Sequence, residues 1–129
     1  MMNTLRLLTL SALSYLLIAC TPHPGAGNWL TTGEENTNFI KEFARLDVDL
    51  EGRTDIFNTT AGQQSDAKDP SSASRRCFWR GQDAQTILMT CVVAGNTDVE
   101  ESYLLRVGPD NVMADLIKDD VIIGHFMRE

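Results

Sequence analysis

The chain has 129 residues, a net charge of −7 and an apolar share of 43%. This length allows one domain, and the composition is that of an ordinary globular protein, not of a disordered one. The acidic charge opposes binding to nucleic acid or to anionic lipid surfaces, so neither is expected as a partner of the chain as a whole. The charge is compatible with a cationic protein partner.

The first nineteen residues have the pattern of a bacterial export signal. A short start with one cation, Arg6, is followed by an apolar core over 7–19. This core is too short and too rich in hydroxyl side chains for a good membrane-spanning helix. We therefore expect residues 1–19 to be a signal peptide that is removed on export.

The apolar core ends in Leu17-Ile18-Ala19-Cys20, which resembles the lipobox of bacterial lipoproteins. The resemblance implies cleavage before Cys20, a diacylglycerol on its sulfur and an acylated amino group. Several acyl chains give a stable membrane anchor, because each buried methylene contributes about 0.8 kcal/mol. Thr21 stands where an Asp would retain enteric lipoproteins in the inner membrane, so the resemblance favours the outer membrane, facing the periplasm. The alternative is a plain secretory signal with a cysteine near the cut.

A segment rich in proline and glycine, 20–27, follows the cleavage site. Such a sequence does not sustain a helix or a sheet ladder, so we expect a tether between lipid and domain, with His23 solvated. The remaining residues, 28–129, are predicted to form a single β domain.

The first half of this domain contains three predicted strands. Residues 28–32 form a short apolar start with Trp29, and 37–43 is either a helical turn or a strand. Leu46, Val48 and Leu50 alternate with polar residues over 45–51, which predicts a strand with one wet face. A turn at 51–52 leads to a returning strand over 54–58. Residues 59–74 lack an apolar period and are predicted to be a long exposed loop.

The second half continues with short strands and regular turns. Strands are predicted over 75–80, 85–94, 103–107, 112–118 and 121–127, with turns at 81–83, 95–98, 108–111 and 119–120. The last strand is apolar on both faces and is expected to be central or covered. Seven to eight such strands predict an all-β fold, either a small antiparallel up-and-down barrel or a strongly curled meander.

Two cysteines remain once Cys20 carries lipid. Cys77 and Cys91 are an even pair in an oxidising compartment, and they face each other if the hairpin between them is centred near Ala84. We therefore expect a disulfide between them. Two cysteines and two distant histidines do not supply a metal site, and no Cys-x-x-Cys redox motif is present.

Two further resemblances concern the domain. Gly27-Asn28-Trp29 is similar to the Gly-x-Trp start of lipocalins, which implies a tryptophan that plugs the barrel base and a carrier of a small apolar ligand. The small lipid-anchored barrels that inhibit lysozyme resemble this chain in size, anchor and expected disulfide. Their Ser-x-x-Gly-x-x-Tyr type of loop is not recognisable in this sequence.

The sequence contains no recognised catalytic motif, so no catalytic residue and no cofactor is predicted. His125 lies in an apolar strand without a nameable partner and is interpreted as structural. Asp47, Asp49, Glu51 and Asp55 cluster around a predicted hairpin. They lack the spaced ligands and the glycine of a calcium loop, so a solvated strand face is favoured over a calcium site.

The best candidate for a binding patch is a group of three arginines, Arg75, Arg76 and Arg80, around Phe78 and Trp79. Arginine and tryptophan are common at binding hot spots. The interpretation that we favour over a binding patch is that Trp79 belongs to the core and the arginines extend along a strand edge.

These observations predict a membrane-anchored envelope lipoprotein that is not an enzyme and that binds or supports a partner in the periplasm. One alternative is an inhibitor of a cationic hydrolase such as lysozyme. Another is a lipocalin-like carrier, which would need an interior cavity of several hundred cubic ångströms.

Overall fold

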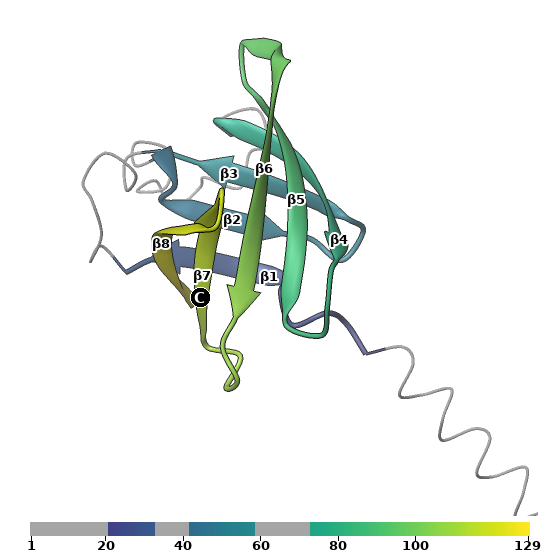
Figure 1. Cartoon of the computed structure of the whole chain (residues 1–129), viewed down its shortest axis with the longest axis vertical. Helices are drawn as coiled ribbons and strands as arrows, with labels where there is room; N and C mark the ends of the chain where they lie inside the picture. Colours follow the sequence, from purple (N-terminus) through teal and green to yellow (C-terminus); the bar gives the residue numbers. More distant parts are fainter. Residues whose placement is uncertain (1–20, 33–41, 59–72) are drawn as a thin grey trace, which may run out of the picture.

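The computed structural model describes residues 21–32, 42–58 and 73–129, which form eight strands (Figure 1). The predicted signal peptide, Cys20 and most of the predicted loop over 59–74 lie outside these ranges. The described residues include no helix that is long and apolar enough to cross a membrane. The strands are β1 (Gly27–Thr31), β2 (Arg45–Val48), β3 (Arg53–Phe57), β4 (Arg75–Gly81), β5 (Thr86–Val93), β6 (Asn96–Val107), β7 (Met113–Lys118) and β8 (Val121–Arg128).

The strands form a closed antiparallel barrel in which each pairs with the next along the chain. β8 returns to pair with β1, where Thr31 lies opposite Phe126. Closure gives every strand a neighbour on both sides, so the small domain has no free sheet edge. The predicted all-β fold and up-and-down barrel are confirmed.

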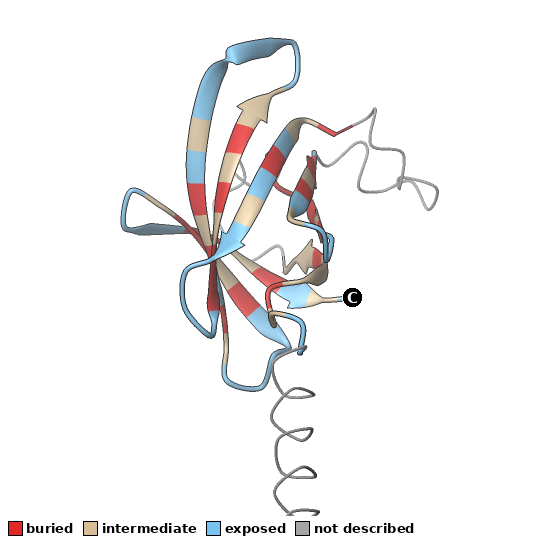
Figure 2. Ribbon diagram, turned by 90° about the vertical axis from the view of Figure 1, so that its right-hand side faces the viewer, coloured by how far each residue is buried: buried red, intermediate tan, exposed pale blue. Residues whose placement is uncertain are grey.

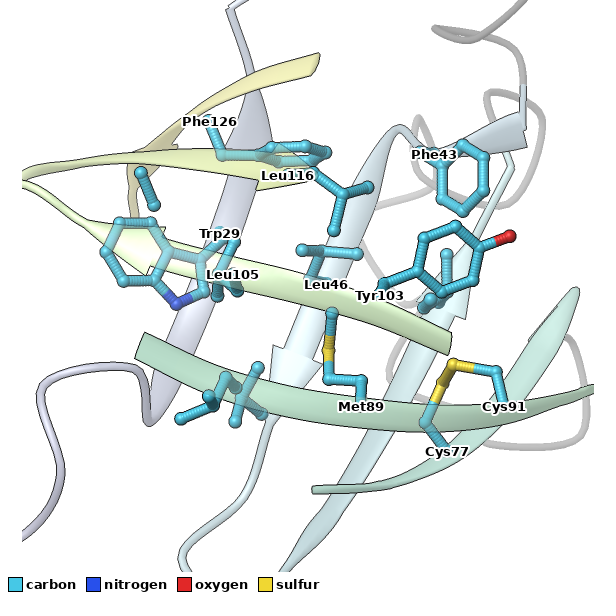
Figure 3. Packing of buried hydrophobic residues seen from close by; sticks show 14 of the residues in the cluster. Trp29, Phe43, Leu46, Cys77, Met89, Cys91, Tyr103, Leu105, Leu116 and Phe126 are labelled. Carbon is cyan, nitrogen blue, oxygen red and sulfur yellow. A yellow bond between two sulfur atoms is a disulfide. The ribbon is translucent and has the colours of Figure 1, made fainter. Parts of the chain in front are cut away.

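Side chains from all eight strands fill the interior of the barrel (Figure 3). Burial alternates along the strands, as the bands in Figure 2 show, because successive residues point to opposite faces. The interior cluster consists of Trp29, Phe43, Leu46, Val48, Ile56, Cys77, Ile87, Met89, Cys91, Tyr103, Leu105, Val107, Ala114, Leu116, Ile123 and Phe126, with Trp79 packed against it.

The predicted disulfide is confirmed and lies inside the barrel. Cys77 of β4 and Cys91 of β5 are direct partners in the antiparallel register, and their Cα atoms are 4.0 Å apart. Both residues are at most 2% exposed. The predicted hairpin centre near Ala84 is therefore correct.

β2 is shorter than predicted. It ends at Val48, and Leu50, which was expected to continue the inward series, is 72% exposed. The Asp49 carboxylate accepts hydrogen bonds from the backbone N–H groups of Glu51 and Arg53, at 3.0 and 2.8 Å. This side chain closes the turn and ends the strand early, which the apolar spacing alone does not reveal.

β6 is longer than predicted. It begins at Asn96, inside the region expected to be a turn, and the turn contracts to Ala94-Gly95. Gly95 has a φ of 83°, a conformation that glycine adopts without steric cost. Residues 96–100 are exposed, and the tip of this hairpin projects beyond the barrel (Figure 1). Because this part of β6 has no buried face, its sequence shows no alternation of apolar and polar residues.

The prediction for the last strand is half correct. β8 is paired on both sides, by β7 and β1. Its outer face is not covered, since Val121, Ile122 and Met127 are 61%, 41% and 49% exposed. The predicted turn at Asp119-Asp120 is present, with both residues at positive φ.

The described part of the expected tether is packed against the barrel. Gly27, the last residue of the expected tether, already belongs to β1. The ring of His23 forms hydrogen bonds with two backbone groups. Its Nε2 donates to the carbonyl oxygen of Asp83 at 2.7 Å, and its Nδ1 accepts from the N–H of Gly25 at 3.0 Å. The prediction of a solvated His23 is wrong, because hydrogen bonds to a distant turn leave no pattern in the local sequence.

Candidate functional site

Trp29 closes one end of the barrel. Its side chain is 0% exposed, and its indole Nε1 donates to the carbonyl oxygen of Gly25 at 3.0 Å. The Arg128 guanidinium lies 4.3 Å from the centroid of the indole ring. The same guanidinium donates to the carbonyl oxygens of Ala26, at 2.7 Å, and Pro24. The segment before β1, the first strand and the last strand are therefore fixed to one another.

An open depression of about 780 Å³ lies beside this base. The segment before β1 and the turn between β2 and β3 form its walls, with Pro22 and His23 on one side and Leu50 and Glu51 on the other. Arg128 also contributes to the lining. Neither Leu50 nor Arg128 belongs to a motif, so nothing in the local sequence marks them as site residues.

The structure divides the predicted patch between the two sides of β4. Arg76, Phe78 and Arg80 lie on the outer face, where Phe78 is 78% exposed. Arg75 and Trp79 lie on the inner side with the disulfide. Trp79 packs against the core and donates from Nε1 to the carbonyl oxygen of Asp49 at 2.9 Å. The favoured interpretation, a core-associated Trp79, therefore describes its position.

A fourth arginine extends the outer part of the patch. Arg53 on β3 lies directly opposite Phe78 in the strand register, with Arg76 and Arg80 two residues to either side of Phe78 on β4. We call these four residues the arginine–phenylalanine face. Three arginine side chains therefore surround one exposed aromatic ring.

Asp55 is the carboxylate next to this face. Its Oδ1 is 3.8 Å from the Nε of Arg53, and it pairs in register with Arg76. Burial raises the pKa of the Asp55 carboxyl, although the positive charges of Arg53 and Arg76 act in the opposite direction. Asp47, the register partner of Asp55 on β2, and Asp49 add further negative charge nearby, so the three arginines stand next to a group of carboxylates.

A polar cluster lies on the inner side of the sheet, towards the end of the barrel that carries the β5–β6 hairpin. The Glu101 carboxylate accepts from the Nε of Arg75 at 2.8 Å and from the hydroxyl of Tyr103. The Arg75 guanidinium lies 4.6 Å from the centroid of the Phe43 ring, and the Lys118 ammonium lies 5.3 Å from that of Tyr103. The members of this cluster come from segments far apart in the chain, so no local sequence pattern predicts it.

These contacts shift the ionisation of the cluster. Burial alone would raise the pKa of Glu101, but the hydrogen bonds from Tyr103 and Arg75 outweigh it and hold the pKa below the ordinary 4.5. Burial, together with the hydrogen bond to Glu101, raises the pKa of the Tyr103 hydroxyl. The groups therefore stabilise one another's ordinary charge states at neutral pH.

Glu101→Gln should reduce stability at pH 7 by about 1–3 kcal/mol, since it removes the closer of the two carboxylates that pair with Arg75, at 2.8 Å, and leaves only Glu42 at 3.4 Å. Because the folded-state pKa of Glu101 is lowered, its contribution is present above pH 4.5 and is lost as the pH falls through the lowered pKa. The difference from wild type should therefore shrink in acid, as measured by urea unfolding at pH 7 and pH 3. Glu100→Gln, at the exposed neighbouring position, is the control. Equal pH dependence of the two variants would contradict this role.

His125 has a partner that the sequence did not reveal. Its Nδ1 is 2.6 Å from Oδ1 of Asp115, and Arg106 lies 3.5 Å from the other oxygen of that carboxylate. The three residues are register partners on the outer faces of β6, β7 and β8. They form a cross-strand ion-pair row on the barrel wall, in keeping with a structural role for His125.

The acidic residues around the β2–β3 hairpin take part in separate interactions. Asp47 accepts from the Nε of Arg45 at 2.8 Å, Asp49 closes the turn, and Asp55 faces Arg53. Within residues 21–32, 42–58 and 73–129, no group of three or more His, Cys, Asp and Glu residues is arranged to hold a metal ion.

Comparison with known proteins identifies no relative. No protein-family model, no curated protein and no solved structure matches this chain. Its function therefore has to be inferred from its own residues.

Proposed function

We propose that the protein is a lipid-anchored lipoprotein of the bacterial envelope with a non-enzymatic binding role. The observation that carries this proposal is the lipobox Leu17-Ile18-Ala19-Cys20 at the end of an apolar export signal. Lipid on Cys20 would hold the barrel at the membrane. Thr21 in place of Asp favours the outer membrane, with the barrel in the periplasm.

Two features of the barrel support binding by its surface. The interior is occupied by a continuous cluster of buried side chains. Glu101 and Tyr103, two of the residues with shifted pKa values, are engaged with each other and with Arg75. In contrast, Phe78 is a large exposed aromatic side chain among guanidinium groups, a combination typical of contact surfaces.

The two alternative functions have less support. A lipocalin-like carrier needs a large interior cavity, and the filled interior counts against it. Trp29 at the barrel base agrees with the Gly-x-Trp resemblance as a matter of architecture only. The lysozyme-inhibitor alternative rests on the acidic charge, and the loop expected to carry inhibition lies mostly outside the described residues.

Cys20→Ser should abolish lipidation and move the protein out of the membrane fraction, or leave it unprocessed, because serine offers no thiol for the thioether. Cell fractionation followed by mass spectrometry of the amino-terminal peptide measures both effects. Thr21→Ser, which keeps the cysteine, should fractionate like the wild type. A Cys20→Ser protein that is still processed and stays with the membrane would refute the anchor.

A further inference from the structure

The lipidated residue of the proposed anchor would lie very close to the barrel. Cys20 directly precedes Thr21, the first described residue, and consecutive Cα atoms are about 3.8 Å apart. His23 is bonded to the β4–β5 turn, and the carbonyl groups of Pro24 and Ala26 are bonded to Arg128. A chain held in this way does not act as a long flexible tether, so the end of the barrel where it leaves must lie at the membrane surface.

The side chains around this exit come from two neighbouring segments. The His23 ring packs closely against Gly81: a Cβ atom placed on this glycine would lie 3.2 Å from the Cδ2 of His23. Arg80 directly precedes Gly81 in β4. Pro22 and His23 share the open depression with Leu50 of the β2–β3 turn. That turn is joined to β4 by the hydrogen bond from the N–H of Trp79 to the carbonyl oxygen of Gly52, at 2.8 Å.

These two segments carry the most exposed large apolar side chains among the described residues. Phe78 is 78% exposed and Leu50 is 72% exposed, while the next, Val121 on β8, is 61% exposed. An aromatic and an aliphatic side chain next to arginines is the composition of surfaces that lie in the headgroup region of a bilayer. The arginine side chains can place their alkyl stems along apolar groups and their guanidinium groups on lipid phosphates.

The three arginines of this surface are a local cationic group in an acidic chain, with carboxylates of the β2–β3 hairpin beside them. The net charge of −7 opposes adsorption to an anionic membrane. Screening limits the influence of distant carboxylates to about 8 Å at physiological salt, so the charges nearest the lipid dominate. Asp49 and Glu51 lie beside Leu50 and keep their negative charges, although backbone N–H groups of the turn hold the Asp49 carboxylate in place. Lipid on Cys20 would supply the affinity, and the three arginines need only orient the barrel.

We propose that Leu50 and the arginine–phenylalanine face form a membrane-docking surface that rests on anionic lipid headgroups. Phe78 and Leu50 reach the acyl boundary, and Arg53, Arg76 and Arg80 contact phosphates. This inference depends on the lipid anchor proposed above and adds a fixed orientation to it. The β5–β6 hairpin tip, at the opposite end of β5 from the chain exit, then points away from the membrane (Figure 1).

The test uses the full-length, lipidated protein in vesicles that contain bromine-labelled phosphatidylglycerol, since bromine quenches tryptophan fluorescence over short distances. Phe78→Trp places a reporter at the proposed contact. Val121→Trp is the matched control, because Val121 is also exposed but lies on β8, four strands away around the barrel. Trp29 and Trp79 are present in both variants, so the comparison isolates the new indole. Far-ultraviolet circular dichroism spectra and thermal midpoints equal to those of the wild type establish that both variants are folded.

The expected result is strong quenching and a blue shift for Phe78→Trp and neither for Val121→Trp. Quenching should fall when Arg76 and Arg80 are replaced by glutamine, and when phosphatidylcholine replaces the anionic lipid. Equal quenching of Phe78→Trp and Val121→Trp in protein whose Cys20 carries lipid by mass spectrometry would overturn the docking surface and leave the anchor intact. If the new indole of Phe78→Trp is shielded from water in native envelope membranes but not in lipid vesicles, the docking surface is also overturned. That result would favour a protein partner. Absence of lipid on Cys20 would refute the anchor, and the docking proposal with it.

Discussion

Trp29→Ala is expected to destabilise the barrel by about 3–5 kcal/mol, the range typical for removal of a fully buried tryptophan. The substitution leaves a cavity at the barrel base and removes the indole donor to the carbonyl oxygen of Gly25. It also removes the ring on which the Arg128 guanidinium lies, 4.3 Å from the ring centroid. Urea unfolding followed by far-ultraviolet circular dichroism measures the loss without relying on tryptophan emission.

Trp79→Ala is the matched control for this experiment. Trp79 is only partly buried, at the margin of the core, and its indole bonds to a turn rather than to the segment before β1. We expect a clearly smaller loss of stability. Faster hydrogen exchange of the Gly25 and Ala26 amides in Trp29→Ala alone would show that the indole holds the chain exit in place. Equal losses in the two variants would contradict a special role for the barrel base.

Removal of the disulfide by Cys77→Ala with Cys91→Ala should cost about 3 kcal/mol in the chain-entropy model for a loop of this size. The two residues are 14 apart in sequence and lie inside the core, so the bond restricts the unfolded chain and its replacement leaves only a small cavity. The measurement is the urea midpoint of the double variant against wild type. Reductant should lower the wild-type midpoint to that of the double variant and leave the double variant unchanged. Two free thiols in periplasmic protein would contradict the bond.

These predictions concern the same physical property, a rigid barrel that presents a fixed surface. The disulfide joins β4 to β5 behind Phe78, and Trp29 with Arg128 holds the chain exit beside β4. A surface that docks on a membrane has to keep its side chains in place, because every residue ordered on contact weakens the binding. Loss of either element should therefore weaken docking of Phe78 as well as folding.

The local sequence was sufficient to predict that these strands follow one another as antiparallel neighbours, but not where β2 ends or β6 begins. Alternation such as Ile87, Met89 and Cys91 identifies an inward face, and short turns such as Asp119-Asp120 allow only antiparallel neighbours. The same alternation places Phe78 opposite in direction to Cys77, so the outer position of Phe78 follows from β4 alone. The disulfide between Cys77 and Cys91 could be predicted because both residues lie at equal distances from the same turn.

Only the tertiary structure decided how the barrel closes and what lies beside the chain exit. The pairing of β1 with β8, the stacking of Arg128 on Trp29 and the bond from His23 to Asp83 join residues that are far apart in sequence. The same holds for the Glu101 cluster. Such contacts form because closing the barrel brings distant strands together and buries their polar groups against one another. Hydrophobic periodicity reports which face a residue presents and contains no information about which distant residue will meet it.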